Sequence, residues 1–415
     1  MPTPPEPPRP SADRLAERLT AYAVLAHDPA VPAIAADYWA KSEDHYRTVD
    51  AALAAFVSGT ARAAYEKVLA DPVHAAHQHT LRAALTALLA EHPAPGRQLA
   101  EAVAEADRHI WIDYHLGADY TAQAPPLPPQ VPETAAATGA PGARPRPGAP
   151  DVQVVIPFRD RAGGTRTRNL LACLRALADQ EGGPGHRVTV VETDSEPRTR
   201  EALAGVVDQY VFARKDGLFN KAWAVNVGVV RATRDAAPGD GYVCVLDADI
   251  LVDRHFVARN TARLRDGGHG THLPFRWSLS LDAPSTLRAI GLRNDEGAAD
   301  VPPSVLRGLL LREPPGGCVW LRADVFHAVG GFDERYEGWG GEDDDVVARL
   351  GAAAPLRRYE DALLHLDHPR PEMTREDGEP FNAHIELGSW TGEHGYGVPE
   401  RFTGTTAGEA APTGS

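Results

Sequence analysis

Apolar residues in the first third of the chain recur at the spacing of amphipathic helices. From Ser11 to about Tyr120 alanine and leucine dominate the sequence, and five prolines interrupt it. Repeats every three or four positions are clearest at Leu15, Leu19, Tyr22 and Leu25. With Ser11 as an N-cap, the pattern predicts a small all-α domain of four or five helices over residues 11–120.

The pattern changes at Val152, where short runs of β-branched apolar residues begin. Such runs indicate buried strands, and the amphipathic stretches between them indicate helices. The predicted strands are 152–158, 187–193, 209–213 and 241–250, and the predicted helices are 167–180 and 220–234. Strands that alternate with helices predict an α/β fold with a mostly parallel central sheet, which binds ligands beyond the carboxyl ends of its strands.

Proline-rich segments separate and flank these two regions. Residues 1–10 hold six prolines, and residues 121–150 hold nine prolines and eight alanines, compositions that cannot bury a core. We therefore expect a disordered lead-in over 1–10 and a linker over 121–150. Residues 403–415 have the composition of a flexible tail, which assigns 151–402 to the α/β domain.

The overall composition excludes several classes of protein. The 415 residues include 42 Lys and Arg against 57 Asp and Glu, a formal net charge of −15. That charge argues against nucleic acid or an anionic membrane surface as a partner. Three widely spaced cysteines form neither a disulfide framework nor a metal site, which indicates a reducing compartment.

Targeting signals are also absent from the sequence pattern. The first residues have no signal-peptide core, and no segment approaches the length of an apolar membrane span, so we expect a cytoplasmic protein. The basic residues are almost all arginine, and alanine, proline and glycine are abundant. This usage is typical of a high-GC bacterium.

The first candidate for chemistry is Asp247-Ala-Asp249, directly after the apolar run YVCVL. Two carboxylates at the end of a strand can point into one cleft as the chain leaves the sheet. Carboxylate oxygens suit Mg²⁺ or Mn²⁺, which can neutralise a diphosphate. The alternative is a solvated turn, but the position after a buried strand favours a metal site.

The second candidate is the block from Gly338 to Asp345, followed by the helical run VVARL. Acids at a helix N-terminus are favoured by the macrodipole, which would explain Asp344 and Asp345. It does not explain Gly-Trp-Gly-Gly, which brings an aromatic ring beside carboxylates. Aromatic faces stack on sugar rings, and a nearby carboxylate can serve as a general base.

The third candidate is the histidine pair in His365-Leu-Asp-His368, which follows an apolar run. Two histidines three residues apart at the end of a strand could both bind one cation. A pair of core or surface histidines explains the same spacing equally well.

Taken in chain order, these segments resemble the β-1,4-galactosyltransferase family and its bacterial relatives. The matching segments are Val155 to Arg161, Phe219 to Lys221, Asn226 to Gly228, Asp247 to Asp249, Gly316-Gly317, Gly330 to Phe332 and Gly338 to Asp345. The resemblance covers about residues 151–370 and leaves the helical region unexplained. It implies a GT-A nucleotide-sugar-binding fold.

The resemblance also implies an activity, namely metal-dependent, inverting transfer of a hexose or N-acetylhexosamine from a UDP-sugar to an acceptor hydroxyl. The cofactor would be Mn²⁺, with Mg²⁺ as an alternative. Asp343 matches the catalytic base, and Glu342 matches its neighbour in the acceptor site. Asp249 and His368 match metal ligands, and Asp247 would lie near the ribose and the metal.

Two positions depart from the family pattern. His365 stands where the family has a methionine that also binds the metal, and nitrogen should suit a first-row cation at least as well. Lys221 replaces an arginine, which disfavours a bidentate phosphate contact. The full set of implied donor-binding residues is Pro157, Phe158, Arg159, Arg161, Glu192, Asp194, Phe219, Lys221, Asp247, Gly317 and Trp339.

Two other functions fit parts of this pattern. A nucleotidyltransferase acting on a sugar phosphate also combines an α/β sheet with acid-bound metal, but it has no evident use for the aromatic-acid block. A noncatalytic nucleotide-sugar-binding scaffold would not need Asp249, Asp343 and His368 together. The donor sugar and the acceptor, whether saccharide, peptide or natural product, remain open.

Two further regions carry expectations without a motif. The segment 276–315, with Trp277, Arg288 and Arg293, is expected to shape the acceptor site. The helical domain is expected to capture the acceptor or to form a homo-oligomer.

Overall fold

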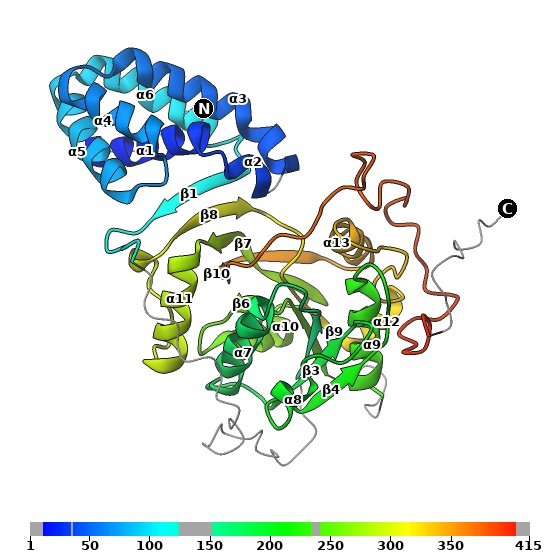
Figure 1. Ribbon diagram of the computed structural model, residues 1–415. Helices are drawn as coiled ribbons and strands as arrows, with labels where there is room; N and C mark the ends of the chain where they lie inside the picture. Colours follow the sequence, from blue (N-terminus) through cyan, green and yellow to red (C-terminus); the bar gives the residue numbers. More distant parts are fainter. Residues whose placement is uncertain (1–10, 35, 124–151, 235–240, 404–415) are drawn as a thin grey trace. The chain divides into compact units, whose positions relative to one another are not determined.

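The computed structural model describes residues 11–34, 36–123, 152–234 and 241–403 (Figure 1). The predicted lead-in, the linker from residue 124 onward and the tail from residue 404 onward lie outside these ranges. The chain forms two compact units. The first comprises Met1–Pro125, Ser278–Arg288 and Pro302–Glu313, and the second comprises Pro126–Trp277, Ala289–Val301 and Pro314–Ser415.

The first unit is built mainly from helices, as predicted. They are α1 (Ala12–His27), α2 (Val31–Ile34), α3 (Ala36–Phe56), α4 (Gly59–Ala70), α5 (Ala75–Glu91) and α6 (Pro93–Ala106). Ser11 caps α1, because its hydroxyl accepts a hydrogen bond from the backbone N–H of Arg14 at 3.3 Å. The apolar faces form one core that includes Leu19, Tyr22, Leu53 and Leu85.

One part of this region departs from the helical prediction. Residues Ile112–Leu116 form strand β1, which pairs antiparallel with β8 (Arg307–Arg312) in the register Tyr114↔Leu309. The segment is rich in aromatic and β-branched residues, which favour a strand. Its partner lies about 190 residues away in sequence, so no local periodicity reveals the pairing.

The second unit contains the predicted parallel strands. They are β2 (Val152–Phe158), β3 (His186–Glu192), β4 (Gln209–Phe212) and β5 (Tyr242–Leu246), in the spatial order β5-β2-β3-β4. The helices α7 (Thr165–Ala178), α8 (Arg200–Leu203) and α9 (Lys221–Ala232) lie between them in sequence. The α/β class with a preceding helical region is therefore confirmed.

The remaining strands make the sheet mixed. Strand β9 (Cys318–Arg322) pairs antiparallel with β5 and with β7 (Thr271–Leu281), and β6 (Ile250–Leu251) pairs antiparallel with β10 (Leu356–His365). The predicted parallel arrangement therefore holds for β2, β3, β4 and β5, whereas the pairings β1–β8, β6–β10, β5–β9 and β7–β9 are antiparallel. The other helical segments are α10 (Phe256–Asp266), α11 (Ala283–Ile290), α12 (Ala323–Ala328), α13 (Glu342–Ala353), the π-helix Gly291–Asp295 and the 3-10 helix Pro303–Val305.

Both faces of the sheet are covered, which explains why its strands are predominantly apolar. Val243 and Val245 of β5 pack in a core formed with α9, α12 and α13. Cys244 alternates with them and points to the other face, where Phe256 of α10 packs against Trp320 at 5.4 Å between ring centroids. The carboxyl ends of β2, β3 and β5 lie at one edge, and that edge positions the candidate site.

The described part of the chain contains no helix long and apolar enough to cross a membrane. Cys173, Cys244 and Cys318 are buried and form no disulfide within the described residues.

Candidate functional site

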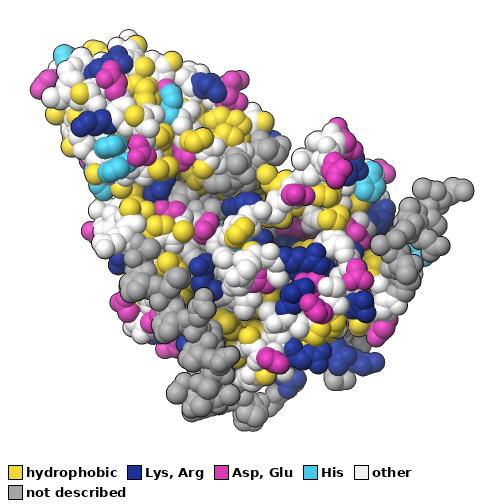
Figure 2. Space-filling view, viewed as in Figure 1, with side chains coloured by type: hydrophobic (Ala, Val, Ile, Leu, Met, Phe, Trp, Pro, Cys, Tyr) yellow, Lys and Arg dark blue, Asp and Glu magenta, His cyan; other side chains and the backbone are white. Residues whose placement is uncertain are grey.

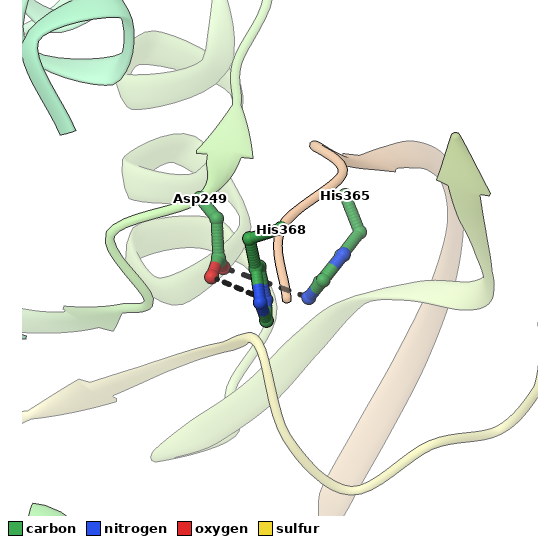
Figure 3. A group of neighbouring side chains, drawn as sticks. All are labelled: Asp249, His365 and His368. Carbon is green, nitrogen blue, oxygen red and sulfur yellow. Dashed lines mark ion pairs between the residues drawn. The ribbon is translucent and has the colours of Figure 1, made fainter. Parts of the chain in front are cut away.

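Asp249, His365 and His368 form a cluster at the β6–β10 ladder (Figure 3). Asp249 precedes β6, and His365 ends β10 opposite Ile250. The Asp249 Oδ2 lies 3.0 Å from Nε2 of His368, and its Oδ1 lies 3.6 Å from Nε2 of His365. One ligand atom from each residue lies within 4.8 Å of the others. The structure thus brings together three residues that the sequence predicted as metal ligands.

The electrostatics of this cluster suit a cation. Oδ1 of the buried Asp249 accepts no hydrogen bond from any described residue. Burial opposes ionisation of this carboxyl, but His365, His368 and Arg166, whose Nη1 lies 3.8 Å away, hold the pKa of Asp249 well below its usual range. Burial lowers the pKa of His365 to about 4, which keeps its ring neutral at pH 7. One carboxylate and two imidazole rings fit a first-row divalent metal.

Lys221 links the two predicted acidic motifs. It is the first residue of α9, which Asn220 caps by accepting a hydrogen bond from the N–H of Trp223 at 2.7 Å. The Lys221 Nζ lies 2.9 Å from Oδ1 of Asp247 and 2.7 Å from Oδ2 of Asp343. A cation at a helix N-terminus is unfavourable, so these carboxylates are needed to offset it.

Glu342 completes this charged group, with Oε1 3.9 Å from the Lys221 Nζ. Burial and then the charge of Asp343 raise the pKa of Glu342 to about 7. Burial also raises the pKa of Asp247 to about 6, against the attraction of Lys221. Although burial disfavours the ammonium, the three carboxylates raise the pKa of Lys221 well above its usual range. At neutral pH the group therefore combines a charged ammonium with a glutamate that can exchange a proton.

The Gly316-Gly317 pair allows this convergence. A Cβ on Gly316 would lie 2.1 Å from Oδ2 of Asp343, so a side chain there would displace the carboxylate. The carbonyl of Gly317, at φ +100°, accepts a hydrogen bond from the N–H of Asp247 at 2.9 Å. These glycines let the backbone before β9 approach both acidic motifs.

The predicted nucleotide loop follows β2, whose last two residues are Pro157 and Phe158. Arg159 donates to the carbonyls of Thr193, Lys215 and Gly217, and its guanidinium lies 5.6 Å from the ring centroid of Phe219. Arg161 pairs with the buried Asp194 at 2.7 Å. The structure therefore gathers four of the predicted donor-binding side chains, Arg159, Arg161, Asp194 and Phe219, at the carboxyl edge.

Glu192 is placed differently from these residues. Its carboxylate is fully buried and accepts hydrogen bonds from Tyr210 Oη, from Thr199 Oγ1 and from the backbone N–H groups of Arg198 and Thr199. Through these hydrogen bonds Glu192 holds the loop that follows β3 rather than facing a ligand.

Two other charged residues, Asp345 and Arg293, are buried in the structure. Asp345 lies in the first turn of α13, where an acid complements the helix dipole, but it is also fully buried and pairs with Arg349 at 2.7 Å. Arg293, expected at the acceptor site, is buried and donates to Asp179 and to the carbonyls of Ala176 and Val252.

The aromatic of the acid block is available to ligands. Trp339 is 44% exposed, and the N–H of the preceding Gly338 donates to the carbonyl of Phe219 at 2.7 Å. On the face drawn in Figure 2, basic and acidic side chains of the second unit are interleaved. Sequence reasoning missed Arg166 beside the metal cluster and Asn382 beside Trp339; the latter lies outside the resembling segment, where no motif signals it.

Two family models match the chain. The model described as glycosyl transferase family 2 matches residues 153–289, which include both aspartates of the Asp247-Ala-Asp249 motif. The model described as the N-terminal domain of galactosyltransferase matches residues 311–362, which include the acid block. The predicted resemblance to galactosyltransferase-like glycosyltransferases is confirmed. No curated protein gives a significant match.

Solved structures with some likeness to the enzyme include two glycosyltransferases. The catalytic domain of Drosophila β-1,4-galactosyltransferase 7 with xylobiose is 17% identical, over 58% of this chain and 74% of that chain, with a TM-score of 0.31. S. aureus TarS 1–349 with UDP-GlcNAc is 13% identical, over 57% of this chain and 62% of that chain, with a TM-score of 0.33.

Proposed function

We propose that this enzyme is a metal-dependent, inverting glycosyltransferase that moves a hexose or N-acetylhexosamine from a UDP-sugar to an acceptor hydroxyl. The observation that carries the proposal is the shared ammonium of Lys221, which contacts both Asp247 and Asp343. A motif suited to the leaving diphosphate and a motif suited to the attacking hydroxyl therefore line one site.

The Asp249–His365–His368 cluster would hold a divalent cation, Mn²⁺ or Mg²⁺, that neutralises the diphosphate when bound. Arg166 adds positive charge beside Asp249. Phe219 offers an aromatic face for the uracil, and the paired Arg161 and Asp194 would hold the ribose.

Transfer would proceed by a single displacement. The acceptor oxygen forms a bond to the anomeric carbon while the bond from that carbon to the UDP oxygen breaks, and the acceptor proton passes to Asp343. The ammonium of Lys221, 2.7 Å from Oδ2 of Asp343, holds that carboxylate in place. Glu342, with a pKa of about 7, is protonated for part of the time and can donate a hydrogen bond to the acceptor. The exposed ring of Trp339 can stack on a sugar.

The direct test is UDP release from UDP-galactose and related donors, with Mn²⁺ and with excess chelator. Release should require the metal, and Asp249→Ala should abolish it because the diphosphate loses its counter-charge. Asp266→Ala, a change at an exposed acid that ends α10, is the matched control and should leave release unchanged. Full activity in chelator would refute the metal assignment.

Three further measurements separate the alternatives. Pyrophosphate release from a nucleoside triphosphate and a sugar phosphate would identify a nucleotidyltransferase. Proton NMR of the product anomer would report inversion or retention. Binding of UDP-sugar without any turnover would favour a noncatalytic scaffold.

A further inference from the structure

The loop that carries Trp339 has a backbone with unusual freedom. We define the Trp339 loop as residues 337–341. Within it Gly338, Gly340 and Gly341 adopt φ values of +78°, +91° and +96°, a region that favours glycine. Because three glycines surround the exposed Trp339, the local sequence does not fix where its indole ring lies. Contacts from elsewhere must therefore fix the indole.

One side-chain amide spans the two ends of this loop. Oδ1 of Asn382 accepts a hydrogen bond from the N–H of Glu337 at 3.1 Å. Its Nδ2 donates to the carbonyl of Gly340 at 2.8 Å and lies 3.5 Å from the carbonyl of Trp339. Asn382 thus uses both its acceptor and its donor on the backbone that flanks the indole.

The neighbouring residues close the loop from two more directions. The Phe381 ring lies against Gly338, where a Cβ would approach it to 3.1 Å. On the donor-binding side, the Gly338 N–H bonds to the Phe219 carbonyl at 2.7 Å, and Lys215 pairs with Glu337 at 3.1 Å. The Trp339 loop is therefore held between the predicted uracil site and the segment after residue 380.

That segment is itself firmly attached to the second unit. The N–H of Gly388 donates to Oδ1 of Asp345 at 2.7 Å, and Nε1 of Trp390 donates to the carbonyl of Gly330 at 2.8 Å. The N–H of Gly397 donates to Oε1 of the buried Glu334 at 2.6 Å. Residues 381–397 therefore act as a frame, and the position of Asn382 is set by this frame.

We propose that Asn382 is a positioning residue that fixes the indole of Trp339 and so sets how tightly the acceptor sugar binds. The link to the acceptor rests on the proposed function, in which Trp339 stacks on a sugar ring. The hydrogen bonds by which Asn382 holds the Trp339 loop do not depend on the proposed function and are tested separately.

The test uses the full chain with Asn382→Ala and Asn382→Asp. The aspartate keeps the acceptor for Glu337 but sets an oxygen against the carbonyl of Gly340, so both variants should release the loop. Thr391→Ala is the control, because among the described residues its hydroxyl accepts a hydrogen bond from the N–H of Glu393, within the same segment, and from no other group. Emission of Trp339 is isolated from the six other tryptophans by subtracting the spectrum of Trp339→Phe.

Both Asn382 variants should raise acrylamide quenching of Trp339, whereas Thr391→Ala should not. With methyl β-glucoside as the acceptor probe, their KM should rise on the order of 10-fold, as expected for two lost hydrogen bonds. Turnover at saturation and the affinity for UDP with Mn²⁺ should stay within twofold. A purely structural role would instead lower the unfolding temperature and leave the quenching of folded protein unchanged.

Unchanged quenching in folded Asn382 variants would overturn the proposal, even if activity fell. If Asn382→Ala does not fold, the isosteric Asn382→Asp decides by the same measurement. Absence of UDP-sugar turnover in the unaltered chain would refute the proposed function instead. Quenching would still show whether Asn382 holds the loop.

Discussion

Replacing Lys221 by methionine removes the ammonium that Asp247 and Asp343 share. The Lys221 side chain is only 12% exposed, and those of Asp247 and Asp343 are 27% and 21% exposed. Removing one partner of a buried ion pair costs about 3–5 kcal/mol. Because the two carboxylates keep some contact with water, we expect a loss of roughly 2–3 kcal/mol in unfolding free energy at pH 8.

The pH dependence follows from the neighbouring acids. Folded pKa values of about 6 for Asp247 and about 7 for Glu342 lie above their ordinary 3.8 and 4.5. The folded state therefore binds more protons than the unfolded state, and stability falls as pH rises through these values. Without Lys221 both pKa values rise further. The cost of Lys221→Met should thus be larger at pH 8 than at pH 5, where the acids are protonated.

The assay is urea unfolding of the metal-free chain at both pH values, in a double-mutant cycle with Asp343→Asn. The two single changes should be non-additive by more than 1 kcal/mol, since residues in one ion-pair network couple. Lys215→Met is the control, because Lys215 is also buried but pairs with one half-exposed acid, Glu337. Additive changes, or an equal cost at pH 5 and pH 8, would refute the shared-ammonium reasoning.

Three further predictions follow from buried groups. Asp345→Asn should lower the unfolding free energy by about 3 kcal/mol or more, because Arg349 is left buried without its partner, and urea unfolding would show it. Burial lowers the pKa of His272 from 6.5 to about 3, so the folded protein should lose up to about 1.4 kcal/mol of unfolding free energy for each pH unit between 6.5 and about 3. His272→Gln should reduce this pH dependence in acid unfolding curves. A chain that begins at Asp151 should aggregate, as judged by size-exclusion chromatography, because β8 loses its partner β1 and Leu309 loses the helical core around it; a monodisperse product would contradict this.

Much of the candidate site could be predicted because its signals are local in sequence. Strands β2, β3 and β5 appear as predominantly apolar runs, since both faces of the sheet are covered. Asp247 and Asp249 follow one of those runs directly, and the strand's end places them at the ligand-binding edge. From spacing alone, His365 and His368 at the end of β10 fitted a metal site or an ordinary core or surface pair equally well. The structure places both rings beside Asp249.

Other features depend on contacts between residues far apart in the chain. Asn382 reaches the Trp339 loop from a segment with no regular structure, and β1 pairs with a strand about 190 residues away. The pairing of Lys221 with both acidic motifs joins residues 26 and 122 positions apart. Periodicity cannot report such contacts, because it records only how neighbours within a turn or a strand share a face.

The sequence by itself determined the α/β class, the preceding helices and the residue types of the site, because side-chain periodicity and short motifs encode secondary structure and chemistry locally. The tertiary structure decided which charges are buried and which residues share a partner. Asp345 shows the difference, since the sequence indicated its place in the first turn of a helix, whereas only packing buries it against Arg349. Burial and pairing are properties of the folded packing, and they set the pKa values and the geometry on which the proposed chemistry depends.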